Sequence, residues 1–172
     1  RMKADDHHFM GKALALAEKA LIRGEFPVGC AVVSSGRVVA GGARTHSRPP
    51  HANEIDHAEM LALRELADSG ISLHQTEAVI YCTMEPCLMC YGALLLAGID
   101  RIVFGFEDVM GGATRADWGS FPSLYRDSAV RVVGGVRRHE CLALFRRFFQ
   151  NPENAYWHGS LLALYTLTQK DG

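Results

Sequence analysis

The sequence predicts one α/β domain in which helices cover both faces of a mixed sheet. Three observations favour this class. The apolar pattern gives a helix, a hairpin, a helix, a strand, a helix and a strand in that order. The chain has 172 residues, of which 48% are hydrophobic and 22% charged, as is usual for a globular domain. A chain of this length can bury a core without disulfide bonds.

Apolar periodicity and β-branched runs set the predicted elements. They are a helix at 8–23, strands at 28–34 and 37–43, a loop at 44–56, a helix from 56 to about 68, a strand at 78–83, a helix at 87–97, a strand at 101–106, a glycine-rich loop at 107–123, a short strand at 130–133, a helix at 138–149 and a last helix within 155–167. Gly24 and Gly98 end helices, and Ser35 with Gly36 forms a two-residue hairpin turn. Asp56 has the chemistry of a helix N-cap.

The charge balance excludes a strong overall attraction to polyanions. Eighteen Lys and Arg stand against nineteen Asp and Glu, which gives a net charge of -1. A nucleic-acid partner would therefore need a local basic patch. No stretch reaches the roughly 20 apolar residues that span a bilayer, and Asp5 and Asp6 do not fit a signal peptide. We expect a cytoplasmic protein with no membrane partner.

Metal-ligating side chains lie at the starts of two predicted helices. Cys87 and Cys90 are three residues apart, so their sulfurs share one helix face, and His57 supplies a third ligand from the other helix. Three nitrogen and sulfur ligands with an open fourth position are typical of a catalytic zinc, whereas a structural zinc has a fourth protein ligand. The spacing therefore predicts one zinc ion that retains a water.

Glu59, two residues after His57, is the predicted catalytic base. Helix N-termini favour the thiolate forms that zinc requires. Two thiolates cancel the charge of the metal, so the zinc activates water less strongly and a nearby base becomes more important. Glu59 would take a proton from that water and pass it to the substrate nitrogen and the leaving amine.

A Cys-x-x-Cys pair by itself would also fit a redox pair or half of a structural zinc site. The upstream His57 and Glu59 favour the catalytic alternative. Histidines outside the motif are assigned as follows: His7, His8, His74 and His158 to the surface, His139 near a helix start, and His46 and His51 to a loop that can approach the pocket. The three other cysteines, Cys30, Cys82 and Cys141, are expected in the core.

His-x-Glu followed by Pro-Cys-x-x-Cys is the signature of zinc nucleobase deaminases. The chain resembles the cytidine deaminase superfamily, in its tRNA adenosine deaminase-like and guanine deaminase-like branch, from about 8 to 149. The resemblance extends to Pro27-Val28-Gly29, to the stretch 83–93 and to the strand at 101–105. It implies a three-layer α/β/α sandwich around a five-stranded mixed sheet, one zinc ion per chain and a homodimer. The domain would occupy 2–150, with a C-terminal helical extension at 151–172 packed on it.

The resemblance also implies the substrate-binding residues. The backbone N–H of Ala58 would position the substrate, and the pocket wall would include acidic residues able to hydrogen-bond a base edge. Family members commonly carry an Asn after the second strand, where this chain has Arg44. The loop that follows includes Asn53 and Glu54, which are expected to add contacts of their own. The predicted set is Val28, Arg44, Asn53, Ala58, Pro86, Glu107 and Asp108.

We therefore expect a hydrolytic deaminase that replaces an exocyclic amine of a purine or pyrimidine with a carbonyl and releases ammonia. A small base, nucleoside or nucleotide is favoured as substrate, with guanine-like purines preferred. Two regions that carry basic residues in tRNA deaminases correspond to residues 108–112 and 148–152 of this chain. Neither region contains a Lys or an Arg here. Arg137, Arg138, Arg146 and Arg147 form the one basic cluster, expected as a solvated helix face.

Two alternatives stay open. The first is a tRNA-specific adenosine deaminase acting on the wobble adenosine. The second is an inactive zinc-binding partner subunit, against which the intact Glu59 argues. The tail at 156–167 would pack as an ordinary helix or cover the pocket, and packing is favoured because aromatic stripes are usually core.

Overall fold

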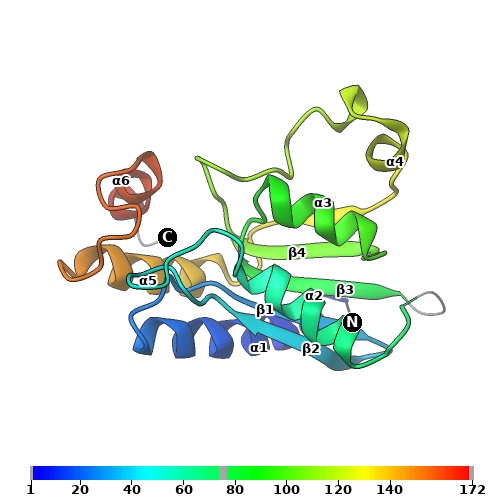
Figure 1. Cartoon of the computed structure of the whole chain (residues 1–172), viewed down its shortest axis with the longest axis horizontal. Helices are drawn as coiled ribbons and strands as arrows, with labels where there is room; N and C mark the ends of the chain where they lie inside the picture. Colours follow the sequence, from blue (N-terminus) through cyan, green and yellow to red (C-terminus); the bar gives the residue numbers. More distant parts are fainter. Residues whose placement is uncertain (1, 74–76, 171–172) are drawn as a thin grey trace.

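The computed structural model describes residues 2–73 and 77–170, and within this part five strands form one mixed sheet (Figure 1). The strand order is β2-β1-β3-β4-β5, with β1 antiparallel to β2 and β3, and β4 parallel to β3 and β5. The strands are β1 (Gly29–Ser34), β2 (Arg37–Ala43), β3 (Ala78–Met84), β4 (Arg101–Phe106) and β5 (Arg131–Val133). The helices are α1 (Met2–Ile22), α2 (Ala58–Asp68), α3 (Leu88–Leu96), α4 (Ser123–Arg126), α5 (Arg138–Gln150) and α6 (Leu161–Thr168), with a 3-10 turn at Trp118–Ser120.

The helices form a layer on each face of the sheet. Figure 1 shows α1 and α5 on one side and α2 and α3 on the other. In agreement, α1 packs on β1, β3 and α5, while α2 packs on β2, β1 and α3. The predicted three-layer fold around a five-stranded mixed sheet is confirmed. Its core includes the buried side chains of Ile80, Ile102 and Phe106.

A glycine allows α2 to lie directly on β2. A Cβ atom on Gly42 would lie 2.0 Å from the carbonyl oxygen of Ala58 and 2.8 Å from the backbone nitrogen of Ala62. Only a residue without a side chain permits this approach. Because Ala58 is the first residue of α2, the contact fixes the start of the helix against the sheet.

The structure corrects several predicted boundaries. Helix α1 starts at Met2 instead of 8, and its first turns carry the buried Asp6, which accepts hydrogen bonds from Arg101. Asp56 is not the N-cap of α2, because its carboxylate is engaged by Asn53 and His46, and His57 takes that position. His74 and residues 171–172 lie outside the described residues.

The last helix also begins later than the apolar pattern predicts, at Leu161 instead of 155. Trp157 and Gly159 have positive φ angles of 54° and 73°, which a continuing helix does not allow. The segment before α6 is therefore a series of turns. Among the described residues, no helix combines the length and the apolarity that a membrane span needs.

Helix α6 is anchored through one carboxylate. Glu107 follows β4 and accepts hydrogen bonds from Arg138 of α5 and Tyr165 of α6. The Tyr165 ring stacks on Phe106 with 6.0 Å between centroids. Burial raises the pKa of Glu107, but the hydrogen bonds from Arg138 and Tyr165 outweigh it and lower the pKa to about 2. The ionised form of Glu107 therefore stabilises the packing of α6.

Replacing this carboxylate should destabilise the chain in a pH-dependent way. The folded pKa of about 2 lies below the ordinary value of 4.5, so the stabilisation is present above pH 4.5 and is lost as the pH falls toward 2. Since Glu107 is 20% and Arg138 34% exposed, solvent screening reduces the effect. We expect Glu107→Gln to lower the free energy of unfolding by about 1 kcal/mol at pH 7.

Urea unfolding at pH 7, 5 and 3.5 measures this difference. The gap between wild type and variant should shrink at the lowest pH. Glu77→Gln, which removes a carboxylate from the exposed ion pair with Arg131, is the matched control and should change stability less. A gap that stayed constant across the three pH values would contradict the role assigned to Glu107.

Candidate metal centre and catalytic pocket

The three predicted metal ligands meet where α2 and α3 begin. His57 is the N-cap of α2 and Cys87 the N-cap of α3, with Cys90 in the first turn of α3. The Nδ1 atom of His57 lies 3.6 Å from the Cys87 sulfur and 3.5 Å from the Cys90 sulfur. All three ligand atoms lie within 4.8 Å of one another. The structure thus brings together residues that are about 30 positions apart in the sequence.

The donor set fits one zinc ion. Zinc binds sulfur at about 2.3 Å and nitrogen at about 2.0 Å, so tetrahedral angles place the two donor atoms about 3.5 Å apart. The two observed nitrogen–sulfur distances agree with this value. Glu59 belongs to a separate group with Cys30 and Cys82, and its role as a base that does not bind the metal stays a prediction.

The pKa values of the Cys87 and Cys90 thiols are shifted in opposite directions. A hydrogen bond from Cys90 lowers the pKa of Cys87 to about 4, even though burial acts in the opposite direction. The same interaction, together with burial, raises the pKa of Cys90. The pair thus shares one proton, which a divalent cation would release because zinc binds both sulfurs as thiolates.

Glu59 lies in the first turn of α2 with only 3% of its surface exposed. Burial raises its pKa to about 7. A carboxyl group whose pKa lies near neutrality can both accept and donate a proton under ordinary conditions. The buried Cys30 and Cys82 thiols pack beside it, with the donor atoms of the three residues within 4.8 Å.

A cavity of about 250 Å³ opens beside the metal ligands. It is lined by Phe26, Val28, Arg44, Glu54, His57, Ala58, Glu59, Met84, Glu85, Cys87, Asp108, Met110, Gly111, Tyr156, Trp157 and Leu162. Most of this wall is apolar, and its charged side chains come from the loop before α2, from α2 and from the segments after β3 and β4. The cavity therefore has the character of a small-molecule or base-binding pocket.

The predicted substrate-binding residues divide into two groups. Four of them line the cavity: Val28, Arg44, Ala58 and Asp108. The other three are engaged elsewhere: Asn53 hydrogen-bonds the backbone and side chain of its own loop, the Pro86 carbonyl accepts from Ala113, and Glu107 anchors α6. Contact of any of the seven with a substrate stays a prediction.

Arg44 holds the loop before α2. It is 2% exposed, and its guanidinium donates to the carbonyl oxygens of Thr45 and Asn53, each at 2.6 Å. Its Cζ atom lies 5.7 Å from the centroid of the Tyr156 ring. Because these contacts engage the guanidinium, the geometry favours a role in shaping the pocket over direct capture of a substrate phosphate.

Glu54 was expected from the sequence to add substrate contacts, and the structure shows a contact with a metal ligand that the sequence did not indicate. Its Oε2 atom lies 3.3 Å from Nε2 of His57, 2.8 Å from the Tyr156 hydroxyl and 3.5 Å from Arg44. A carboxylate on the second ring nitrogen fixes the orientation of a metal-binding histidine. The sequence signal that could have indicated this role was the position of Glu54 three residues before His57, in a loop that brings its carboxylate to the imidazole ring.

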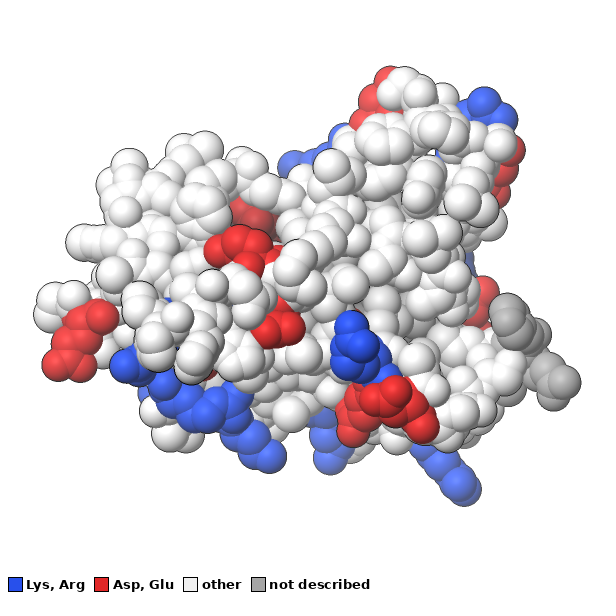
Figure 2. Space-filling model, viewed as in Figure 1, with Lys and Arg blue, Asp and Glu red and all other residues white. Residues whose placement is uncertain are grey.

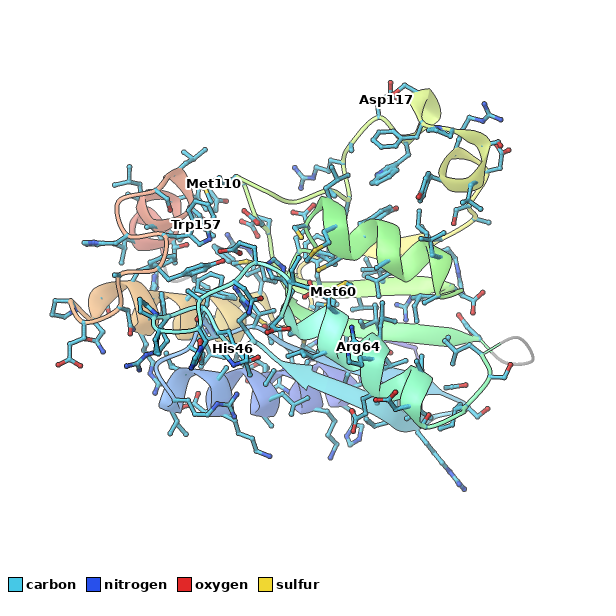
Figure 3. The ribbon with its side chains drawn as sticks, in the orientation of Figure 1. His46, Met60, Arg64, Met110, Asp117 and Trp157 are labelled. Carbon is cyan, nitrogen blue, oxygen red and sulfur yellow. The ribbon has the colours of Figure 1, made fainter. Side chains whose placement is uncertain are left out.

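The C-terminal segment both packs on the domain and covers the pocket. Helix α6 packs on α5, while Tyr156, Trp157 and Leu162 line the cavity. Figure 3 shows Met110, from the loop after β4, and Trp157 on the same side of the molecule, and both line the cavity. The two alternatives foreseen for this tail therefore coexist.

Glu85 ties the opposite wall to the metal helix. It is 6% exposed and accepts hydrogen bonds from the backbone nitrogens of Asp108, at 3.2 Å, and Thr114, at 3.1 Å. A Cβ atom on Gly112 would lie 2.5 Å from its carboxylate, so a glycine is needed there. Glu85 therefore fixes the loop that carries Asp108 into the pocket.

Removing the Glu54 carboxylate should weaken zinc binding. Glu54→Gln keeps the size of the side chain but removes the charge that orients the His57 ring, and loss of such partners typically costs about 10- to 100-fold in metal affinity. Competition with a chromophoric chelator at pH 7 measures the dissociation constant. Asp68→Asn, which removes a carboxylate at the opposite end of α2 from His57, is the control and should leave the zinc affinity unchanged. Equal zinc affinities for wild type and Glu54→Gln would contradict the role assigned to Glu54.

The comparisons with known proteins agree with this geometry. Residues 3–106 match the family described as "Cytidine and deoxycytidylate deaminase zinc-binding region". The chain is 33% identical to a tRNA-specific adenosine deaminase of Bacillus subtilis over 150 residues, 84% of this chain and 89% of the relative. It is 35% identical to that of Haemophilus influenzae over 145 residues, 84% of this chain and 83% of the relative.

Solved structures show the same fold. A chain from a study of A-to-I editing by tRNA:A34 deaminases superposes with a TM-score of 0.66 at 32% identity, covering 80% of this chain and 98% of that one. A Thermotoga maritima diaminohydroxyphosphoribosylaminopyrimidine deaminase/reductase gives 0.63 at 27% identity, covering 84% of this chain and 40% of that one. With its zinc-binding residues assembled and its matched segment spanning more than half of the sequence, this chain belongs to the cytidine and deoxycytidylate deaminase zinc-binding family.

Proposed function

We propose that the chain is a hydrolytic adenosine deaminase that acts on tRNA. The observation that carries the proposal is the match to tRNA-specific adenosine deaminases over more than four fifths of both chains, at 33% and 35% identity. The sequence alone favoured a small base, nucleoside or nucleotide because the chain lacks an overall positive charge. The relatives favour the alternative, an adenosine within tRNA.

The pocket supplies the groups that this reaction needs. His57, Cys87 and Cys90 would hold the zinc, which when bound supplies a water of lowered pKa as nucleophile. Glu59 would accept a proton from the attacking water and deliver it to the ring nitrogen, and would then carry a second proton, from the newly added hydroxyl group, to the departing amine, which leaves as ammonia. The burial that raises the pKa of Glu59 to about 7 suits both transfers.

The rest of the wall would position the base. Ala58 is the first residue of α2, so its N–H has no acceptor within the helix and is available to a substrate. Val28 and Trp157 supply apolar surface for the faces of the ring, and Asp108 supplies a polar group. Burial raises the pKa of Asp108, and its Oδ1 atom accepts hydrogen bonds from the backbone nitrogens of Met110 and Gly111, which hold the carboxyl group at the pocket wall.

A panel of substrates tests the proposal. Ammonia release from zinc-loaded protein should occur with an RNA hairpin that carries adenosine in its loop, and be slower by at least 100-fold in kcat/KM with adenosine, guanine or cytidine. Turnover of a free base or nucleoside alone would instead support the small-substrate alternative. No turnover of any substrate would support the inactive partner subunit.

Two variants test the assigned roles in the same assay. Glu59→Gln should keep about one zinc per chain and lose turnover by at least 100-fold, because it cannot transfer protons. His57→Ala should lose the zinc itself, since it removes one of three ligands. Metal analysis and rate are measured on the same samples, and equal metal loss in both variants would contradict the separation of ligand and base.

We also propose that the chain forms a homodimer through α2 and α3. The apolar surface there is lined by Met60, Leu88, Met89, Leu96, Trp118, Phe121 and Tyr125. Leu88 is 55% and Leu96 61% exposed, and Figure 3 shows Met60 on this part of the molecule. Contiguous exposed apolar surface of this kind marks association sites.

Leu96→Glu should convert the dimer to a monomer, because it places a charge in the apolar contact. Light scattering coupled to size-exclusion chromatography measures the mass, which for wild type should be twice that of the 18.9 kDa chain. Leu164→Glu, on an exposed position of α6, should leave the mass unchanged. A wild-type monomer would overturn this assembly.

A further inference from the structure

A second and larger hollow adjoins the catalytic pocket. Its volume is about 680 Å³, and Tyr156 lines both it and the pocket. Its lining residues include Arg23, Arg48, Arg147, Glu153 and Tyr156. In contrast to the catalytic pocket, polar atoms make up most of its wall.

Three arginines from three separate segments meet at this hollow. Arg23 follows α1, Arg48 lies in the loop between β2 and α2, and Arg147 lies in the last turn of α5. All three are exposed. Figure 2 shows Lys and Arg side chains gathering at the lower left, over the end of α1 and the adjoining loop of Figure 1. We define Arg23, Arg48 and Arg147 as the arginine hollow.

Existing contacts leave these cations available to a ligand. Arg48 donates from Nη1 to the carbonyl oxygen of Arg23 at 3.3 Å, which orients one guanidinium at the rim without neutralising it. Arg147 pairs with Glu18 at 2.9 Å, and these side chains are 56% and 40% exposed, so the pair is readily exchanged for another anion. Glu153 is the acidic residue of the lining and partly offsets the positive charge.

We propose that the arginine hollow binds phosphate groups of the RNA strand that carries the target base. The guanidinium group matches phosphate oxygens with paired hydrogen bonds, and it keeps its charge at any physiological pH. Because the hollow shares Tyr156 with the pocket, it is a neighbouring surface over which the backbone of a strand with its base in the pocket can run. The inference rests on the proposed function and names the residues that this chain uses for the phosphates.

The arginine hollow explains how a chain without a net positive charge could bind RNA. A net charge of -1 gives no overall field toward a polyanion, so binding depends on a local patch. Of the four arginines in the basic cluster foreseen from the sequence, Arg137 and Arg138 are paired with Glu140 and Glu107. Arg147 alone of that cluster lines the hollow, and its neighbours there come from distant parts of the chain.

The test removes the three charges from the full, zinc-loaded chain. In the variant Arg23→Gln/Arg48→Gln/Arg147→Gln we expect the Kd for an RNA hairpin with adenosine in its loop to rise at least tenfold at physiological salt. The slope of log K against log salt concentration should fall by about 2 to 3, because each phosphate contact contributes about 1. Fluorescence anisotropy at several salt concentrations measures both quantities.

A charge-matched control separates local contacts from net charge. Arg37→Gln/Arg126→Gln/Arg131→Gln removes three exposed arginines from the β1–β2 hairpin, α4 and the start of β5, all outside the hollow. It should leave most of the affinity and the salt slope intact. Circular dichroism checks the folding of both variants, and the single variant Arg48→Gln, with an expected rise in Kd of at least twofold, serves if the triple variant does not fold.

The outcomes separate this inference from the proposed function. Wild-type affinity and salt slope in the hollow variant, with RNA bound and deaminated, would overturn the phosphate site alone. If wild type acts only on small substrates, the tRNA function fails, and adenosine and adenosine monophosphate are then compared. A rise in KM for the monophosphate alone in the hollow variant would support the phosphate site with a free nucleotide as its source, and no rise would overturn it.

Discussion

The active centre depends on the starts of two helices being held at one point. The His57 ring and the Cys87 and Cys90 sulfurs belong to different helices, yet their donor atoms lie within 4.8 Å. On one side the position is fixed by Gly42, whose missing side chain lets α2 rest on β2. On the other side β3 leads through Glu85 directly into the start of α3. Zinc binding requires both placements to be accurate to a fraction of an ångström.

The carboxylates of Glu54 and Glu85 hold the segments around the metal ligands in place. Glu54 touches His57, Arg44 and Tyr156 at once, so it connects a metal ligand to the loop before α2 and to the C-terminal segment. Glu85 holds the loop of Asp108 and Thr114 on the opposite wall. Glu59 lies buried in the first turn of α2, and burial raises its pKa to about 7. Structural carboxylates thus hold the surroundings of the residue proposed to transfer protons.

In the proposed function, recognition of the substrate depends on local charge and not on the net charge of the chain. The wall of the pocket is mostly apolar and suits a base, whereas the adjoining hollow is polar and carries arginines. A base and its phosphates would thus be recognised by different segments of the chain. The C-terminal segment takes part in both, because Tyr156 lies at their boundary.

The sequence by itself determined the fold class and the His57, Cys87 and Cys90 cluster that could bind one zinc ion, and it predicted Glu59 as a separate catalytic carboxylate. Residue spacing within one helix and the residue types at helix starts carry that information, because these are local properties of the chain. Only the tertiary structure decided that His57 and not Asp56 caps α2, that Glu54 orients the His57 ring, and that Tyr156 covers the pocket. It also decided that Arg23, Arg48 and Arg147 surround one hollow. The contact between Glu54 and Tyr156 joins residues 102 positions apart, and packing of the sheet and helices, which no local pattern encodes, brings such residues together.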